Sequence, residues 1–340
     1  MPEKNSRILL GHGSGGKLTH ELIDSLFVKH FNNPELDRQT DAALLEVPAH
    51  KIAFTTDAFV VDPIFFPGGD IGKLAVCGTV NDVAVSGATP LYLSAAFIIE
   101  EGFPLQDLER IVISMAEEAK MAGVSIVTGD TKVVNKDKCD KVFITTTGIG
   151  TLAEKHYSIS EGKQVRAGDK VIINGSIGDH GMAIMSARNE LKLSAPLISD
   201  CASLNGLISE ITGASEKVHF MRDATRGGLA TVITELSTNK DYGINIYEER
   251  LLIDEGVRGM CELLGFDPMY VANEGKVVVV VADEDAEIVV KAMQKNKFGK
   301  DARIIGEVVT DHPGRAWLQT VIGGNRIIDM LAGEQLPRIC

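Results

Sequence analysis

The chain has 340 residues, too many for one ordinary hydrophobic core, and this length predicts two domains. Its 47 acidic and 34 basic residues give a net charge of −13, which argues against nucleic-acid binding because that needs a positive surface. No apolar run reaches the roughly 18 residues of a membrane span, and the first residues lack the apolar core of a secretory signal.

The first half of the chain alternates helical and extended segments. Leu18, Leu22 and Leu26 recur at helical spacing, and Asp70 and Gly87 are suited to open and end a later helix. We expect helices at 17–31, 70–87 and 105–122, and strands at 51–60, 90–99, 124–130 and 141–150.

The second half continues with further strands and helices after a polar, non-periodic stretch at 153–166, which is typical of a linker. We expect strands at 167–175, 275–282 and 302–309, helices at 180–191, 202–212 and 283–296, and a strand–turn–helix unit over 218–236. Gly333 and Pro337 interrupt the last residues, which are predicted to form a mobile tail. The predicted fold is α/β of the α+β type, with domains at 1–155 and 156–330 and a flexible C-terminal tail at 331–340.

The segment "GHGSGGKL", which begins at Gly11, matches the first part of a phosphate-binding P-loop. Leu18 stands where a P-loop needs Ser or Thr to hold Mg²⁺, so a P-loop ATPase is not indicated. Two interpretations stay open. The segment is either a flexible turn before a helix or a glycine-rich stretch whose backbone N–H groups fold over phosphates in another geometry.

Four aspartates stand next to apolar segments, where an unpaired carboxylate is costly. Asp57 and Asp130 directly follow apolar strands, Asp82 lies in the last turns of an apolar helix, and Asp223 ends a strand. Each alone fits a helix cap or a salt bridge, but together they are typical of oxygen ligands for Mg²⁺ that carries a nucleotide. Asp41 is a fifth candidate, for which a cap fits equally well.

Two cationic residues accompany the aspartates. Lys132 follows Asp130 by two residues, so an extended backbone places both side chains on one face. Arg226 follows Asp223 by three residues, beside a Gly-Gly pair that lets a phosphate approach the next helix. A surface ion pair accounts equally well for either cation taken alone.

The five cysteines are widely spaced and form no CxxC pair, so neither a zinc site nor a disulfide framework is indicated. We expect reduced thiols in the cytoplasm. Cys77 and Cys261 fall on apolar helix faces and Cys201 falls near a helix start, so all three suit structural roles. Cys139 is expected to be exposed but lacks an activating partner. Cys340 ends the chain in "PRIC", either as an incidental residue of a frayed terminus or as a reactive group that a mobile tail carries.

Several motifs together resemble one family. "VNDVAVSGATPLYL", "TGDTKVV", "RDATRGGLA", "NEGKVVVVV" and "IGEVV" occur here in the order typical of the aminoimidazole-ribonucleotide-synthetase-like ATP-dependent family. The N-terminal "GHGSGGK" and the terminal "PRIC" narrow the resemblance to the carbamoyl dehydratases of NiFe-hydrogenase maturation. The resemblance extends over essentially the whole chain.

The resemblance implies two α/β domains, a homodimer formed through a mixed N-terminal sheet, and ATP lying across the domain and subunit junction. In such proteins a carbamoyltransferase, HypF, loads a carbamoyl group onto the terminal cysteine. ATP and Mg²⁺ then serve its dehydration to a thiocyanate, and the cyano group passes to iron on a HypC–HypD complex. The resemblance does not say whether the tail enters its own subunit's site or its neighbour's.

The resemblance also implies roles for individual residues. Cys340 carries the substrate, Lys132 stabilises charge on the transferred phosphate, and Glu274 takes protons from the amide nitrogen. His12 is the competing base, and a plain turn residue is the structural alternative for Glu274. The metal ligands are expected among Asp57, Asp82, Asp130 and Asp223. The nucleotide site is expected to include these four together with Gly13, Gly15, Gly16, Thr128, Gly129 and Arg226.

Two other functions stay open. A small-molecule kinase or ligase of the same superfamily, such as a thiamine-phosphate kinase, a selenophosphate synthetase or the purine-pathway cyclase, would not need Cys340. A selenophosphate synthetase is disfavoured because residues 1–20 contain no cysteine. A non-catalytic scaffold that docks maturation partners through its tail would show no ATP turnover.

Overall fold

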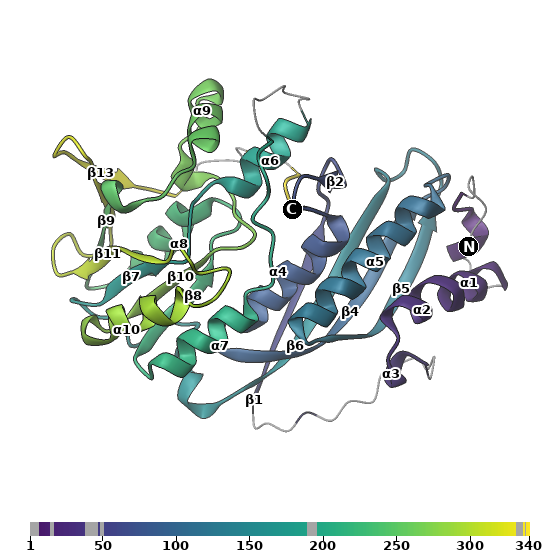
Figure 1. Cartoon of the computed structure of the whole chain (residues 1–340), viewed down its shortest axis with the longest axis horizontal. Coiled ribbons are helices and arrows are strands. Elements are labelled where there is room, and N and C mark those ends of the chain that lie inside the picture. The colour runs from purple at the N-terminus through teal and green to yellow at the C-terminus, as the bar shows by residue number, and fades with distance from the viewer. Residues whose placement is uncertain are drawn as a thin grey trace.

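The computed structural model describes residues 7–13, 17–37, 47, 51–188, 196–330, 336 and 338–340. The protein has two halves, each built on a β-sheet with helices packed on it (Figure 1). Helix α1 (Lys17–Leu22) lies at the far end of the first half, whereas the C-terminus lies between the halves, near β2 (Phe65–Phe66) (Figure 1). The chain end therefore reaches a region to which both halves contribute residues.

The first half contains a four-stranded sheet in the order β1-β6-β4-β5. β4 and β5 run parallel, and the other neighbours are antiparallel. The strands are β1 (Lys51–Phe59), β4 (Ala88–Glu100), β5 (Ser125–Val134) and β6 (Val142–Leu152). Helices α4 (Ile71–Val85) and α5 (Leu105–Ala122) pack together on one face of the sheet. The sequence predicts all six of these elements, and the structure confirms them.

Helix α4 lies at the centre of the first core. Asp70 caps it by accepting the N–H groups of Gly72 and Lys73 at 2.7 and 3.1 Å, which confirms the predicted start. A Cβ atom on Gly72 would lie 2.4 Å from the carbonyl oxygen of Ile111, so glycine at this position lets α4 approach α5 closely.

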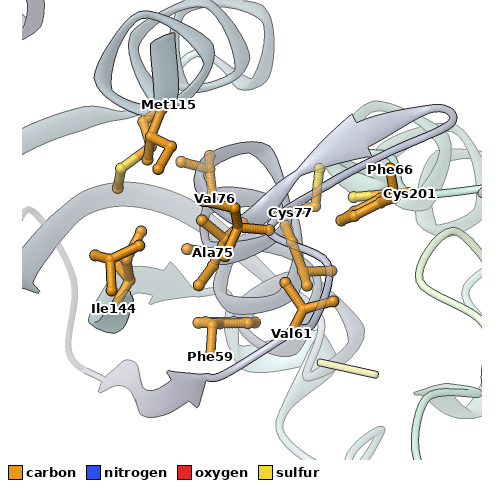
Figure 2. Close-up of a cluster of buried hydrophobic side chains, with 14 of the residues drawn as sticks. Phe59, Val61, Phe66, Ala75, Val76, Cys77, Met115, Ile144 and Cys201 are labelled. Atoms are coloured by element: carbon orange, nitrogen blue, oxygen red, sulfur yellow. The ribbon is translucent and has the colours of Figure 1, made fainter. Parts of the chain in front are cut away.

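The core around α4 also draws on the second half of the chain. Figure 2 shows Cys77 of α4 among buried side chains of the first half, with Cys201 beside it. Burial raises the pKa of the Cys77 thiol, and a hydrogen bond to Cys77 together with burial raises that of Cys201. Both groups therefore stay protonated at neutral pH, which fits the structural role expected for them.

The described segments before β1 pack along β5 and α5. They form η1 (Leu10–Gly13), α1 (Lys17–Leu22), η2 (Ile23–Val28), α2 (Lys29–Phe31) and α3 (Pro34–Asp37). Residues 17–31 are thus helical throughout, with a π-helical middle, and the predicted helix is confirmed. Leu18 is 41% exposed, so the apolar face begins one turn later than its spacing predicts.

The second half contains a seven-stranded sheet in the order β13-β12-β9-β11-β7-β10-β8, antiparallel except between β12 and β9. Its strands are β7 (Lys170–Ile173), β8 (Val218–Asp223), β9 (Gly243–Tyr247), β10 (Val277–Val281), β11 (Arg303–Val309), β12 (Ala316–Gln319) and β13 (Asn325–Ile328). Its helices are α6 (Asp179–Arg188), α7 (Asn205–Ala214), α8 (Gly228–Ser237), α9 (Glu255–Leu264) and α10 (Asp283–Met293).

Strand β10 is covered on both faces, which explains its uninterrupted run of valines. Val278 and Val280 pack in the cluster that contains α8, whereas Val277, Val279 and Val281 pack in the cluster that contains α7 and α10. The turn that precedes β10 is therefore anchored to a fully buried strand.

Among the described strands and α-helices of the second half, four have no counterpart in the prediction from sequence, namely β9, α9, β12 and β13. Shorter segments complete the fold: β3 (Gly69–Asp70), η3 (Glu154–His156), η4 (Glu248–Arg250) and η5 (Pro268–Tyr270). The stretch predicted as a linker is packed, since Ile159 and Val165 within it are buried. No helix in the described ranges has the length and apolar character needed to cross a membrane.

Candidate active site

A small pocket of about 50 Å³ lies between the two halves and contains the C-terminal residue. The first half contributes residues of β1 and α4, and the second half contributes the turn between β8 and α8 and the segment before β10. Six residues that the sequence singles out meet here. The lining residues are Asp57, Ala58, Phe59, Gly78, Asp82, Asp223, Thr225, Arg226, Glu274 and Cys340.

Hydroxyl groups hold Asp57 and Asp82 in place. Thr79 Oγ1 donates to Asp57 Oδ2 at 2.8 Å, and Thr55 Oγ1 donates to Asp82 Oδ2 at 3.0 Å. Each pair joins β1 to α4, so the packing of this helix on this strand sets the spacing of the two carboxylates. Asp57 lies inside β1, within the strand predicted at 51–60 and not directly after it.

Three aspartates in the pocket disfavour one another's ionisation. Burial raises the pKa of Asp57, and burial and the charge of Asp57 raise that of Asp82 to about 6. Burial and the charge of Asp82 raise the pKa of Asp223 to about 7. Arg226 opposes the shifts of Asp57 and Asp82 without cancelling them. A cation entering this pocket would be stabilised by the excess of negative charge.

Glu274 lies buried in the turn before β10. Burial raises its pKa well above the usual value, and the charges of Asp223 and Asp200 add to this effect. The Asp200 carboxylate fixes the turn by accepting the N–H groups of Glu274 and Gly275 at 3.0 and 3.1 Å. A Cβ atom on Gly275 would lie 1.9 Å from the Asp200 carbonyl oxygen, so only glycine fits.

Asn81, which precedes Asp82, joins α4 to the second half. Its Nδ2 donates to the carbonyl oxygen of Ala202 at 3.0 Å, and its Oδ1 accepts the N–H of Leu204 at 2.7 Å. The sequence analysis does not single out Asn81. An amide side chain in an apolar helix could nevertheless have been identified in the same way as a carboxylate, because both need specific hydrogen-bond partners when buried.

The end of the chain pairs with the loop after β1. The N–H of Val60 donates to the carbonyl oxygen of Cys340, and the N–H of Asp62 donates to that of Arg338, both at 3.1 Å. Arg338 Nε returns a hydrogen bond to the carbonyl oxygen of Val60 at 3.1 Å. The described part of the tail is therefore docked along the first half in a strand-like manner.

The second half holds the tail through His180 of α6. His180 Nε2 lies 2.6 Å from the carbonyl oxygen of Ile339, and its Nδ1 lies 2.8 Å from Ser199 Oγ. Burial lowers the pKa of His180, so the imidazole is neutral, and its proton is on Nε2 because a carbonyl oxygen can only accept. Leu336 and Ile339 are buried as well, so the mobility of the tail stays a prediction.

The Cys340 side chain reaches the pocket beside Arg226 and Glu274. Burial and the charge of Glu274 raise the pKa of the thiol to about 12, although Arg226 hydrogen-bonds to it and opposes the shift. Arg226 is presented by a tight turn in which Gly228 has a φ of +59°. A Cβ atom on Gly228 would lie 2.5 Å from the carbonyl oxygen of Val271. Because its pKa is raised to about 12, the docked Cys340 thiol is protonated at neutral pH.

Asp130 and Lys132 lie elsewhere in a single chain. Both are inside β5, where they pair with Ala96 and Ile98 of β4. The intervening Phe97 is buried in the core with α4 and α5, so Asp130 and Lys132 point to the opposite face of the sheet. They share one face, as predicted, but Asp130 lies within a strand because β5 continues past the apolar run.

The other predicted residues lie along the same strand. Thr128 and Gly129 belong to β5, and Gly13 ends η1, which packs beside β5. His12 accepts the N–H of Leu9 at 2.9 Å and does not line the pocket that holds Cys340. Three candidates lie outside the described residues, namely Gly15, Gly16 and Asp41.

The face of the sheet that carries Asp130 and Lys132 is apolar and exposed. Ile52, Phe54 and Ile98 on this sheet are 51%, 66% and 42% exposed. Large exposed apolar patches on soluble proteins are often sites of association.

In the described part of the chain, no three His, Cys, Asp or Glu side chains are arranged to hold one metal ion by themselves. Mg²⁺ in nucleotide sites is usually held by one or two carboxylates together with phosphate oxygens and water. The paired carboxylates of Asp57 and Asp82 fit that mode of binding.

Comparison with known proteins points to one family. Residues 39–152 and 166–319 match the N-terminal and C-terminal domains of the family described as AIR synthase related protein. A carbamoyl dehydratase HypE from Rhodobacter capsulatus is 48% identical over the full length of both chains. The crystal structure of the hydrogenase maturation protein HypE in complex with ATP has a TM-score of 0.93 at 46% identity, covering 98% of this chain and 99% of that one. A chain of a HypE–HypF complex has a TM-score of 0.79 at 52% identity, covering 91% and 99%.

Proposed function

The chain belongs to the HypE family of carbamoyl dehydratases within the AIR synthase related proteins, and on that basis we propose that it dehydrates a carbamoyl group carried on Cys340, with ATP as the second substrate. The observation that supports this proposal is the position of the C-terminal residue inside a pocket that also contains four acidic residues. A chain end that carries its own substrate needs such a place to dock. The acidic residues are Asp57, Asp82, Asp223 and Glu274.

The reaction replaces a poor leaving group, hydroxide, by phosphate. The carboxamide oxygen attacks the γ-phosphorus of ATP, an O–P bond forms, ADP leaves, and one N–H proton goes to a base. The C–O bond then breaks, phosphate departs with the oxygen, and the second N–H proton leaves. The S-carbamoyl group and ATP thus give a thiocyanate, ADP and phosphate. Little covalent chemistry is required of the protein, so its main tasks are positioning and charge stabilisation.

Glu274 is the base in this proposal. After burial, its charge is the largest influence on the Cys340 thiol, whereas His12 does not line the pocket. Burial favours the protonated form of Glu274 and so raises its pKa. Positive charge that enters with the nucleotide offsets the repulsion from Asp223 and Asp57, which frees the carboxylate to accept the amide proton.

Asp57, Asp82 and Asp223 are the proposed Mg²⁺ ligands in the pocket, with Asp130 as a further ligand. When bound with ATP, Mg²⁺ neutralises charge on the phosphates. Arg226, next to the docked thiol, is placed to contact the phosphate that is transferred. Phosphate oxygens and water complete the coordination in this arrangement, because the aspartates alone do not enclose an ion.

A homodimer completes the site in this proposal. Pairing two copies through the exposed sheet face would bury the apolar side chains of Ile52, Phe54 and Ile98. It would also bring the partner's Lys132 and the partner's Asp130 from that face toward the nucleotide. Thr128, Gly129 and Gly13 lie on or beside the same strand, where they would contact the triphosphate.

The tail must also leave the pocket for loading and delivery. The docked thiol has a pKa of about 12 and is a poor nucleophile, so carbamoylation by HypF requires an undocked Cys340. The cyano group would then pass to a HypC–HypD complex. We place these steps in the cytoplasm, where the thiols stay reduced.

Intact-mass measurement tests this function directly. Protein carbamoylated on Cys340 should lose the mass of one water molecule when ATP and Mg²⁺ are added, with release of ADP and phosphate. A kinase would instead phosphorylate an added small molecule, and a scaffold would leave the mass and the ATP unchanged.

Cys139 provides the matched control, since it is the other cysteine that is not buried. Cys139→Ser should undergo the same mass change as the wild type, whereas Cys340→Ser should accept no carbamoyl group and still bind ATP. Dehydration that persists in Cys340→Ser would rule out the terminal thiol as the carrier.

A further inference from the structure

A second and larger pocket borders the segment 198–202. Its volume is about 430 Å³, which is within the range of small-molecule sites. Residues of both halves line it, from Gly68 and Lys73 at the start of α4 to the loop 297–301 after α10. We call it the lysine pocket, because its lining includes Lys73, Lys276, Lys297 and Lys300 against two acidic residues, Asp200 and Asp301.

The lysines of this pocket differ in their partners. Lys276 Nζ lies 2.7 Å from Asp200 Oδ2 and 3.4 Å from Asp179 Oδ2, so its charge is compensated. Lys73 Nζ instead donates to the carbonyl oxygen of Gly68 at 3.0 Å, and Lys297 Nζ lies 4.4 Å from the centroid of a neighbouring aromatic ring. Within the described ranges, no carboxylate lies at ion-pair distance from Lys73, Lys297 or Lys300.

We propose that the lysine pocket binds a small molecule that carries a phosphate group. Lys297 and Lys300 are exposed, and three ammonium groups around one cavity, without an ion pair to any described residue, create a positive potential that attracts an anion. Lysine binds phosphate as a point charge. The Phe298 ring and Ile198, which is 62% exposed, offer apolar surface to the organic part of such a ligand.

The lysine pocket shares a wall with the catalytic pocket. Lys276 lines the former, and its partner Asp200 holds the turn that presents Glu274 to the latter. An anion that approaches Lys276 competes with Asp200 for the ammonium group and so acts on that turn. This consequence rests on the proposed function of Glu274, whereas binding itself does not.

Calorimetric titration of the full chain with inorganic pyrophosphate in EDTA tests the site. Without Mg²⁺, the carboxylates of the catalytic pocket repel pyrophosphate, so binding reports the lysine pocket. The double variant Lys297→Gln with Lys300→Gln should weaken binding about tenfold or more, because each charge-assisted contact contributes about a factor of ten. Lys291→Gln with Lys295→Gln removes the same charge from exposed positions in and after α10 and should leave binding unchanged.

Three results would overturn the proposal. The first is absence of pyrophosphate binding by the wild type, and the second is an equal loss in both double variants, which would reflect overall charge only. The third is a loss caused by Arg226→Gln but not by the lysine variant, which would place pyrophosphate in the catalytic pocket. The titration needs neither ATP nor a carbamoyl group, so its outcome is independent of whether dehydration occurs.

Discussion

His180 Nε2 lies 2.6 Å from the carbonyl oxygen of Ile339, and this hydrogen bond ties the C-terminal tail to the second half of the molecule. Ser199 Oγ occupies the other ring nitrogen at 2.8 Å. The ring of Phe66 meets the imidazole edge-on, with 5.6 Å between centroids. His180 is thus fixed on three sides and holds the tail one residue before its reactive end.

Replacing His180 by Ala should shift the tail toward the undocked state. A buried hydrogen bond contributes about 0.5–1.5 kcal/mol, so the docking equilibrium should change by up to about tenfold. Undocking removes the burial that raises the pKa of the Cys340 thiol to about 12, so the thiol becomes more reactive. The measurement is the rate of alkylation of Cys340 by iodoacetamide, followed by mass spectrometry of the C-terminal peptide.

His156→Ala is the control for this substitution. His156 Nδ1 also contacts a carbonyl oxygen, that of Gly87 at 2.8 Å, but far from the tail in the fold. It should leave the alkylation rate of Cys340 unchanged. If His180→Ala also leaves the rate unchanged, the tail docks without help from the imidazole.

Asp200→Asn should lower the free energy of unfolding and should make it depend less on pH in the acid range. Burial opposes both charges of the Asp200–Lys276 pair, but Lys276 holds the pKa of Asp200 below 3.8, and Asp200 and Asp179 hold that of Lys276 above 10.5. The contribution of Asp200 is present above pH 3.8 and is lost as the pH falls through its lower folded pKa. The contribution of Lys276 to the free energy of unfolding is present below pH 10.5 and is lost as the pH rises through its higher folded pKa.

Urea denaturation over a range of pH measures this effect. Removing one partner of a buried pair costs about 3–5 kcal/mol in the free energy of unfolding. In the variant, the part of the decrease in stability at acid pH that comes from protonation of Asp200 should be absent. Glu284→Gln breaks the exposed pair with Lys217 and should change stability little, because solvent screens it. Comparable effects of the two substitutions would contradict a dominant role for the buried pair.

The parts of the fold that were predicted are those with a local signal. Helix α5 begins and ends where its helical period does, and α4 begins at the cap residue Asp70. Strands β12 and β13, which were missed, have four residues each, too few for alternation to stand out. Helix α9 does keep a helical period in its buried residues Val257, Met260 and Cys261, but it contains two glycines, which are unfavourable inside a helix.

In the candidate site, too, the residues that were predicted have a local sequence signal, whereas His180, which was missed, does not. Asp82 and Asp223 were found because a carboxylate in an apolar segment needs a partner. The same reasoning places Asp130 in one site with Asp82 and Asp223, although the register of β5 puts Asp130 on the face of the sheet away from α4. His180 was passed over because its partner, Ile339, lies 159 residues away, and no local pattern reveals such a contact.

Glu274→Gln should slow dehydration and leave the tail and nucleotide in place. Glutamine keeps the shape of the side chain but cannot accept the amide proton, and a general base contributes a factor of about 10² or more. The measurement is a single turnover of protein already carbamoylated on Cys340. Glu118→Gln changes another buried glutamate, which accepts the N–H of Ser203, and should turn over normally. A wild-type rate in Glu274→Gln would exclude it as the base.

Phe54→Asp should dissociate the proposed homodimer. Phe54 is 66% exposed in one chain, and burying a phenylalanine against a partner contributes about 1.5–3 kcal/mol per copy, which a buried carboxylate would reverse. Sedimentation velocity should show that the variant is a monomer at protein concentrations at which the wild type is a dimer. Leu263→Asp alters a similarly exposed apolar residue on α9 and should leave the oligomeric state unchanged. A dimer that withstands Phe54→Asp would have to form through another surface.

Mixing two inactive variants tests whether each site takes Lys132 from the neighbouring subunit. Lys132 and Glu274 lie on opposite sides of the first sheet within one chain, so one chain alone does not bring them together. In a mixed dimer of Lys132→Ala with Glu274→Gln, a shared site leaves one of the two sites intact and the other doubly altered. Since half of the dimers are mixed after re-equilibration, activity should recover to about a quarter of the wild type. If both residues act within one subunit, every site carries one substitution and the mixture stays as inactive as its components.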